Sequence, residues 1–485
     1  MKKTFTERKS KTSTKRARNR EFVIITYLFV AVFIMMMGYF VYFQVFKSED
    51  FINSPYNTRQ NTFAEHVTRG QILSSDEKVL AQTVVGEDGS ETRYYPYGAM
   101  FAHAVGYDSN GKSGIESFGN FNLLRSHAFF LEQVINGIQD KKNPGDNVVT
   151  TLDYRLQEAA YQALGDNRGA VIAMEPSTGK ILTLVSKPDF DPNTIADNWE
   201  SIISNTDSEN SVLVNRVTQG LYPPGSTFKI LTTLEYLREN ANYEDYHYDC
   251  TGSIAMDNTE IHCYDNAVHG AENLQKSFAK SCNTSYANIG LGLNKTRFAG
   301  LCKELLFDTD LPVSYPSNKS SFVLDSKSNA DEVTQMAIGQ GETLVTPMHM
   351  ALITSAIANN GTLMRPSIID HTENYRGVTV KKFNFLPYGT LLSESEAKKM
   401  QEFMSLVVSE GTGSKLSGQS YHAAGKTGSA EFSNIKGESH AWFTGYASTE
   451  EKGSIVVTVI VENGGAGSSV AVPIAKQVFD TYFAL

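Results

Sequence analysis

Apolar residues gather in distinct patterns along this chain, and the first pattern predicts a membrane segment. Residues 22–43 form a run of 22 residues without a charge. At 1.5 Å per residue a helix of this length spans about 33 Å, enough to cross a hydrocarbon core of about 30 Å. The run is longer than the apolar part of a cleavable signal peptide, and Gln44–Ser48 offers no small-residue cleavage site. We therefore expect a retained transmembrane helix.

The segment 44–148 is polar and rich in turn residues, with short apolar patches such as Val79–Ala81 and Val105–Tyr107. No continuous helical period runs through it. The pattern therefore predicts a small, irregular domain that contains strands. The turn-rich stretch Lys141–Asp146 marks its end.

Beyond residue 148, short apolar runs predict strands in two groups. Val148–Leu152 is strand-like, and Asp153 can cap a helix through Leu164. The other expected strands are Gly169–Met174, Lys180–Val185, Gly425–Phe432, His440–Tyr446 and Ser454–Glu462, the first two as a hairpin. Pro473 then opens an amphipathic helix, and residues from about 200 to 420 look mostly helical. This order predicts an α+β fold with one antiparallel sheet that a large helical insertion divides in sequence.

Charge adds an orientation to this picture. Residues 1–21 hold nine lysines and arginines against two glutamates, a net of +7, which leaves −17 for the other 464 residues. Basic residues stay on the cytoplasmic side, so we expect residues 44–485 to lie outside the membrane. The acidic body argues against a nucleic-acid partner. The predicted division is 1–21 cytoplasmic tail, 22–43 transmembrane helix, 44–148 non-catalytic domain and 149–485 main domain.

Candidate chemistry begins at Ser226-Thr227-Phe228-Lys229. A serine nucleophile needs a nearby base, and residues three apart share one face of a helix. Ser226 follows Pro223-Pro224-Gly225 and precedes a helical stripe, so it is expected in a first turn, where free N–H groups favour an oxyanion. Lys229 has to be neutral to accept a proton, and burial and a second nearby cation would lower its pKa.

This motif means little alone, because S-x-x-K occurs seven times in the chain. The specific signal is the combination of this motif with two others in a fixed order. Ser281-Cys282-Asn283 follows Ser226 by 55 residues in an expected turn, and Lys426-Thr427-Gly428-Ser429 follows Asn283 by 143 residues at the start of an expected strand. Gly425-Lys426-Thr427 also looks like the end of a phosphate-binding loop, but position 420 is serine where that loop needs glycine.

The order S-x-x-K, S-x-N, K-T-G resembles penicillin-binding proteins and serine β-lactamases, with Cys282 where the class A β-lactamase motif has aspartate. Further stretches resemble class B penicillin-binding proteins, most closely the compact penicillin-binding-protein-A type. They are Arg69–Ile72, Val79–Ala81, Gly114–Glu116, Thr151–Asp153, Gly169–Val171, Gly339–Gly341, Thr346-Pro347 and Trp442–Gly445. Segment 44–148 is too short for a glycosyltransferase domain, which excludes the bifunctional class A type.

The resemblance implies a fold and a set of roles. The fold is a transmembrane helix, a dimerisation-like pedestal and a transpeptidase domain with a five-stranded antiparallel sheet flanked by helices. Ser226 would attack the bond between two D-alanines of a peptidoglycan stem peptide. Lys229 would take its proton, and Asn283 would hold Lys229 and substrate. Ser281 would relay a proton with the help of Lys426. Lys426 and Thr427, beside Gly428, would bind the terminal carboxylate. The N–H groups of Ser226 and Ser429 would form the oxyanion hole.

The resemblance further implies cross-linking of stem peptides, inhibition by β-lactams, a membrane location and a partner glycosyltransferase of the SEDS type, with no cofactor. Three alternatives stay open. They are a relative that hydrolyses or senses β-lactams, a non-catalytic cell-wall scaffold, and a D,D-carboxypeptidase in which water replaces the acceptor amine.

The four cysteines are too few for a disulfide scaffold. Residues 247–269 concentrate two of them with three histidines, but no C-x₂-C or H-E-x-x-H spacing appears, so no metal is predicted. Two ordinary half-buried thiols are expected at Cys250 and Cys263, with a disulfide between them left open. Cys282 and Cys302 are expected in or near the core, and Trp442 in sheet packing.

Overall fold

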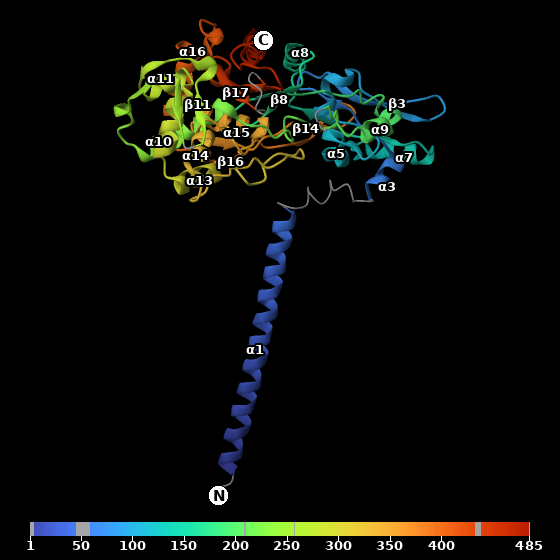
Figure 1. Ribbon diagram of the computed structural model, residues 1–485. Helices are drawn as coiled ribbons and strands as arrows, with labels where there is room; N and C mark the ends of the chain where they lie inside the picture. Colours follow the sequence, from blue (N-terminus) through green and yellow to red (C-terminus); the bar gives the residue numbers. More distant parts are fainter. Residues whose placement is uncertain (1–3, 45–58, 208–209, 257, 432–437, 485) are drawn as a thin grey trace. The chain divides into compact units, whose positions relative to one another are not determined.

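The computed structural model describes residues 4–44, 59–207, 210–256, 258–431 and 438–484. The chain divides into two compact units, 1–60 and 61–485. The first contains helix α1 (Thr4–Tyr42), drawn in blue in Figure 1. Its segment Phe22–Tyr42 is long and apolar enough to cross a membrane, and none of it is buried. This agrees with the anchor expected from the sequence.

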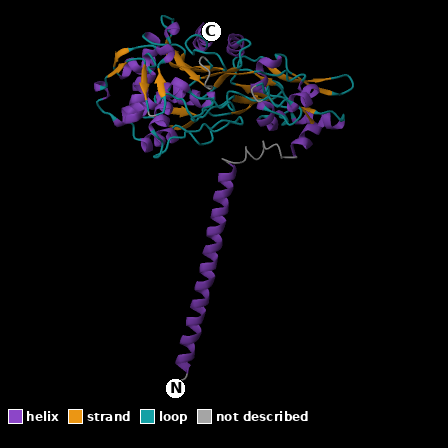
Figure 2. Cartoon of the chain, in the orientation of Figure 1, coloured by secondary structure: helices purple, strands orange, loops and turns teal. Residues whose placement is uncertain are grey.

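A five-stranded antiparallel sheet lies at the centre of the second unit (Figure 2). Its strands, in spatial order, are β17 (His422–Glu431), β18 (Ser439–Thr449), β19 (Gly453–Val461), β7 (Gly169–Met174) and β8 (Ile181–Lys187). The early hairpin and the three late strands meet where β19 pairs with β7. The predicted split sheet and α+β class are thus confirmed, although Phe432 of the first late strand lies outside the described residues.

Helices cover both faces of this sheet. Along β7, Ala170 and Ile172 pack into the cluster that contains helix α15 (Pro347–Ala358). Val171 and Ala173 pack into the cluster that contains α8 (Tyr154–Leu164) and α17 (Ala471–Ala484). Because successive strand residues face opposite sides, a strand buried on both faces reads as an unbroken apolar run.

The helix ends follow from local chemistry. Asp153 caps α8 as predicted, and its carboxylate accepts a hydrogen bond from the N–H of Leu156 at 3.0 Å. Helix α17 begins two residues before Pro473. The proline therefore lies in the first turn, where the missing N–H removes no intrahelical hydrogen bond.

The helical insertion contains the elements that carry the site. Its helices are α9 (Ile195–Ser204), α10 (Lys229–Glu239), α11 (Leu274–Ala279), α12 (Asn283–Gly292), α13 (Lys295–Glu304), α14 (Ala330–Ala337), α15 and α16 (Glu394–Ser409). Short strands were not predicted there, because runs of three or four residues carry too little periodicity. They are β9 (Tyr248–Cys250), β10 (Ser253–Ala255), β11 (Glu260–His262), β12 (Gly270–Glu272), β13 (Thr362–Met364) and β16 (Pro387–Thr390).

The pedestal region is more helical than the sequence predicted. It contains α3 (Arg59–His66), α4 (Ala102–Val105), α5 (Gly114–Phe118), α6 (Asn120–Leu123) and α7 (Phe130–Ile138), together with β1 (Val67–Thr68), β2 (Ile72–Leu73), β3 (Val79–Val85), β4 (Glu91–Tyr94) and β5 (Asn143–Pro144). None of these helices exceeds nine residues, so none leaves a helical period long enough to recognise.

A second sheet connects the pedestal region with the rest of the unit. Its order is β15 (Thr379–Lys382), β14 (Ile369–Glu373), β6 (Asn147–Thr150), β2, β3 and β4. Strand β6 pairs with β2 on one side and with β14 on the other. The predicted boundary at 148/149 falls inside β6, and this division of the chain stays a prediction.

A buried ion cluster joins two of the motifs that suggested the family. Glu116 is fully buried, and its carboxylate accepts hydrogen bonds from Arg69 at 2.6 Å and from Arg93 at 2.7 Å. Burial alone would raise the pKa of Glu116, but the two guanidinium groups outweigh it and keep the pKa below its ordinary value. Arg93 also donates to the carbonyl of Gly70 at 2.7 Å. The cluster therefore ties α5 to the turn before β2.

Glu116→Gln is expected to destabilise the protein strongly, because it removes the charge that balances two buried arginines. Loss of one partner from a buried ion pair costs about 3–5 kcal/mol. The measurement is the unfolding midpoint of the full chain in detergent. Lys398→Ala, which removes an exposed pair with Glu394, serves as the control and should leave the midpoint unchanged. Equal midpoints for the two variants would contradict the expectation.

Candidate functional site

Ser226 lies in a short 3₁₀ turn (Gly225–Phe228) that leads directly into α10. The sequence placed it in a first helical turn, and the turn is of the tighter type. Its side chain is half-buried, whereas Thr227 and Phe228 are buried. The N–H of Gly225 donates to the carbonyl of Gly339 at 2.8 Å. The turn is thus fixed by a backbone hydrogen bond, and Ser226 stays partly exposed.

Lys229 is fully buried, and its ammonium group points at the S-x-N motif. Its Nζ donates to Asn283 Oδ1 at 2.7 Å, to the Ser281 carbonyl at 2.7 Å and to Ser281 Oγ at 3.2 Å. Among the described residues, no hydrogen bond joins Lys229 to Ser226. The S-x-N motif therefore holds Lys229, the expected base, which lies three residues after Ser226, the expected nucleophile.

Lys426 approaches Ser281 from the five-stranded sheet. It is fully buried on β17, and its Nζ donates to Ser281 Oγ at 2.8 Å. Ser281 lies between α11 and α12 in the turn predicted there, with a φ of 60°. This left-handed conformation is uncommon for a residue other than glycine. It brings the Ser281 hydroxyl between the two lysines.

The two lysines cannot both remain ordinary ammonium groups. Burial lowers the pKa of Lys229 to about 8. Burial also lowers the pKa of Lys426 well below its usual value, and the nearby charge of Lys229 adds to the effect. Both lysines therefore give up a proton more readily than an exposed lysine does.

Strand β17 brings the K-T-G motif against the turn that bears Ser226. A Cβ at Gly428 would lie 3.2 Å from the Pro224 carbonyl oxygen and 3.0 Å from Trp442 Cβ, so glycine allows this close approach. Trp442 is buried, and its indole N–H donates to the Pro223 carbonyl at 3.0 Å. The tryptophan thus packs within the sheet, as predicted, and also fixes the start of the turn.

β17 forms one edge of the five-stranded sheet. Lys426, Thr427, Gly428 and Ser429 lie together on it, in register with Thr444 to Ala441 of β18. No strand of the described sheet pairs with the outer side of β17, so an extended peptide can add there by backbone hydrogen bonds.

Sequence reasoning missed supporting residues that act through backbone or hydroxyl groups. Gly339, with a φ of 78°, fits against Gly225, and a Cβ there would lie 1.9 Å from the Gly225 oxygen. Thr412 Oγ1 hydrogen-bonds Thr427 Oγ1 at 2.5 Å. Asn283 Nδ2 donates to the His262 carbonyl at 2.9 Å. Only the Gly339–Gly341 motif gave a signal in the sequence, and it suggested no role.

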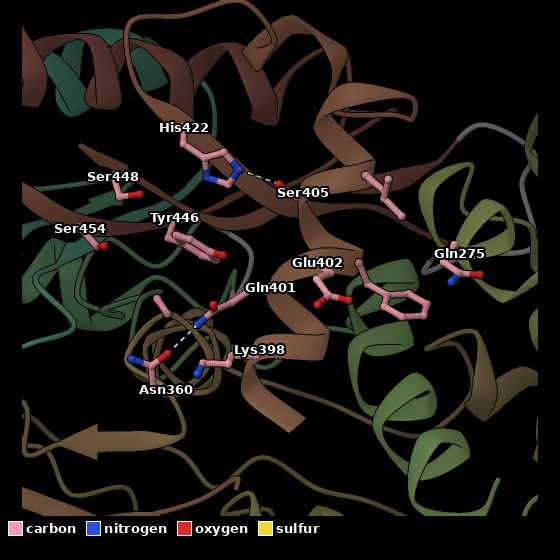
Figure 3. A pocket seen from close by; sticks show the side chains of 13 residues that line it. Gln275, Asn360, Lys398, Gln401, Glu402, Ser405, His422, Tyr446, Ser448 and Ser454 are labelled. Atoms are coloured by element: carbon pink, nitrogen blue, oxygen red, sulfur yellow. Dashed lines mark hydrogen bonds between the residues drawn. The ribbon is translucent and has the colours of Figure 1, made fainter. Parts of the chain in front are cut away.

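A separate cavity of about 700 Å³ opens near the start of β17 (Figure 3). It is lined by α16 residues such as Gln401 and Glu402, and by His422, whose ring lies 2.7 Å from Ser405 Oγ. None of its lining residues belongs to the three motifs. The cluster of the three motifs and this cavity are therefore distinct features of the fold.

Comparison with known proteins agrees with this geometry. Residues 169–480, more than half of the chain, match the penicillin-binding protein transpeptidase domain. The chain belongs to this family. Residues 69–148 match the dimerisation domain of penicillin-binding protein A. The sequence-based recognition of the family is confirmed.

Individual relatives resemble nearly the whole chain. The peptidoglycan D,D-transpeptidase PbpA of Mycolicibacterium smegmatis is 29% identical, over 89% of this chain and 92% of the relative. Penicillin-binding protein A of M. tuberculosis, solved as a penicillin G acyl-enzyme complex, is 26% identical with a TM-score of 0.76, over 86% of this chain and 99% of that one. PBP2 of Pseudomonas aeruginosa is 28% identical with a TM-score of 0.70, over 86% and 96%.

Gly339→Ala is expected to destabilise the protein more than Gly341→Ala. Both glycines have φ near 80°, where an alanine costs about 1–2 kcal/mol. Only the Cβ at position 339 would also collide with backbone, the Gly225 oxygen. Thermal unfolding of the two variants in detergent checks the difference. Equal losses would mean that contact between Gly339 and the nucleophile turn does not constrain the fold.

Proposed function

We propose that this protein is a serine-type peptidoglycan D,D-transpeptidase. The single observation that carries the proposal is the convergence of Lys229 and Lys426 on Ser281, directly beside the turn that bears Ser226. Two buried lysines of lowered pKa are suited to moving protons, which an acyl transfer requires twice. The relatives named as D,D-transpeptidases and the acyl-enzyme structures support the same activity.

The first half of the reaction is acylation. Ser226 Oγ attacks the carbonyl between two D-alanines of a stem peptide, and neutral Lys229 accepts the hydroxyl proton. The backbone N–H groups of Ser226 and Ser429 stabilise the oxyanion. Ser281 passes a proton to the departing D-alanine amine and is reprotonated by the adjacent lysine. The carbon–nitrogen bond breaks, and an ester to Ser226 remains.

The second half transfers the acyl group. The amine of a neighbouring stem peptide attacks the ester, its proton passes to the lysine pair, and Ser226 regains its own proton as the new amide forms. Thr427 and Lys426 bind the terminal carboxylate of the donor peptide, while Gly428 lets the backbone of β17 lie close to the turn that bears Ser226. Asn283 orients Lys229 and contacts the peptide.

The setting of the reaction follows from the rest of the chain. The basic residues before α1 favour a cytoplasmic N-terminus, so the site would work on the outer side of the membrane, where peptidoglycan lies. A glycosyltransferase of the SEDS type is the expected partner. This orientation and this partner are proposals that rest on charge and on the family resemblance.

Acylation by a fluorescent penicillin tests the nucleophile. The full-length chain in detergent should form a stable one-to-one adduct, visible in a denaturing gel and by intact mass. Ser226→Ala should lose it, because among the described residues no other hydroxyl has the same turn and lysine. Ser109→Ala, which alters another S-x-x-K sequence, is the matched control and should label normally.

The other outcomes separate the rival functions. Turnover of the drug without a lasting adduct would identify a β-lactamase, and neither adduct nor turnover would indicate a scaffold. With lipid-linked peptidoglycan as substrate, release of D-alanine without cross-links would identify a carboxypeptidase. Each of these results would replace the proposed activity.

The pH dependence of acylation tests the base. Lys229 is protonated below its pKa of about 8, and a protonated amine cannot accept the Ser226 proton. The acylation rate should therefore rise with pH through about 8 and level off above it. Single-turnover labelling from pH 6 to 10 measures this, with Ser226→Ala giving the background. An inflection well below 8 would contradict Lys229 as the base.

A further inference from the structure

Three cysteines and one histidine come together beside the S-x-N motif. Cys250 ends β9, Cys263 follows β11, and His269 precedes β12. Cys282 is the N-cap of α12 and the central residue of the motif itself. All three thiols are buried and His269 is half-buried. The four ligand atoms lie within 4.8 Å of one another.

Three of the six separations between the ligand atoms match a tetrahedral metal site, and none of these three matches a disulfide. Cys263 Sγ lies 3.7 Å from Cys250 Sγ and 3.7 Å from Cys282 Sγ, and Cys250 Sγ lies 3.4 Å from His269 Nδ1. In a zinc tetrahedron with Zn–S of about 2.3 Å and Zn–N of about 2.0 Å, two sulfurs are about 3.8 Å apart, and a sulfur and a nitrogen about 3.5 Å. A disulfide requires about 2.05 Å between sulfurs, and all four cysteines are free.

The groups around the cluster resemble the outer shell of a thiolate site. Thr284 Oγ1 donates to Cys250 Sγ at 3.3 Å, and the N–H of Ser285 donates to Cys282 Sγ at 3.4 Å. Such donors hold metal-bound thiolates in place and tune the metal. Sulfur and imidazole ligands favour zinc over the hard cations magnesium and calcium.

The short strands around the cluster would gain stability from a bound metal. In the described part of the chain, β9 pairs only with β12, and β10 only with β11, as two ribbons of three residues per strand. Isolated two-stranded ribbons are barely stable in water. A metal held by both ribbons and by the start of α12 would join them to the catalytic helix, as metals do in other small lobes.

We propose that one zinc ion binds here in a site of three thiolates and one imidazole: Cys250, Cys263, His269 and Cys282. This departs from the sequence-based prediction of no metal. The ligands are separated by 13, 6 and 13 residues, so they do not form a short-spaced metal-binding motif in the sequence. Their proximity depends on the ribbons folding back onto α12.

The site lies one residue from two catalytic hydrogen bonds. Cys282 separates Ser281 from Asn283, the two partners of Lys229. The His262 carbonyl, next to Cys263, accepts the second hydrogen bond of the Asn283 amide at 2.9 Å. The zinc ion would therefore fix both the motif and the carbonyl that orients Asn283, and its removal should slow acylation.

Metal analysis of the full-length chain, purified in detergent without chelator, tests the site. We expect one zinc ion per chain by inductively coupled plasma mass spectrometry. Cys250→Ser and Cys263→Ser should each lose most of it, while Cys302→Ser, a buried cysteine of α13 outside the cluster, should retain it. Absence of zinc from the wild type, or equal zinc in all variants, would overturn the proposal.

Two measurements on the wild type avoid dependence on the folding of variants. Titration with an organomercurial should release one zinc as the cluster thiols react. Reconstitution with cobalt should give thiolate-to-cobalt charge transfer and the strong visible bands of tetrahedral cobalt. A weak octahedral spectrum, or a Cys250–Cys263 disulfide found by peptide mass mapping, would contradict a thiolate site.

The link to catalysis has its own readout, which rests on the proposed function. Removal of zinc should slow labelling by fluorescent penicillin by about tenfold or more, the scale seen when outer-shell partners of a metal site are lost, and added zinc should restore it. Unchanged labelling after removal would overturn the link. A wild type that holds zinc but never labels would refute the proposed function and leave the metal site standing.

Discussion

The site depends on two fully buried lysines that share one serine hydroxyl. Lys229 and Lys426 both donate to Ser281 Oγ, at 3.2 and 2.8 Å. Burying a charged amine is costly, and two like charges at this separation repel each other, so the pair keeps its lowered pKa values only while the surrounding fold excludes water. Most other features of the site serve to hold these three residues in place.

The scaffold meets this demand with elements distant in sequence. Lys229 opens a helix whose buried face packs into the main core, and Lys426 lies on a strand whose partners are apolar on both faces. Gly225 and Gly428 remove the Cβ atoms that would separate the nucleophile turn from β17. The turn itself is fixed by backbone, through Gly339, and by the indole of Trp442. The lysines therefore meet on rigid elements.

Much of this could be predicted from the sequence, for a physical reason. Strands β7, β8 and β19 are largely apolar runs bounded by turn residues, and the three motifs carry their own chemistry. The pedestal helices and the ribbons were not predicted, because elements of three to nine residues show no detectable hydrophobic period. Thr412 and the His262 carbonyl escaped because a hydroxyl and a backbone oxygen have no sequence signature. Cys250, Cys263 and His269 were noticed in the sequence, but no metal site was predicted because their spacing matches no short metal-binding motif and Cys282 was assigned to the core.

Asn283 shows how one side chain can hold Lys229, the proposed base, and contact the ribbons at the same time. Its carboxamide offers an acceptor to Lys229 Nζ at 2.7 Å and a donor to the His262 carbonyl at 2.9 Å. An aspartate of the same shape could only accept. It would leave the His262 carbonyl without its donor, and its negative charge would raise the pKa of Lys229 and keep that lysine protonated. The amide instead holds the lysine in place without stabilising its charge strongly, which is the condition under which a buried lysine can act as a base.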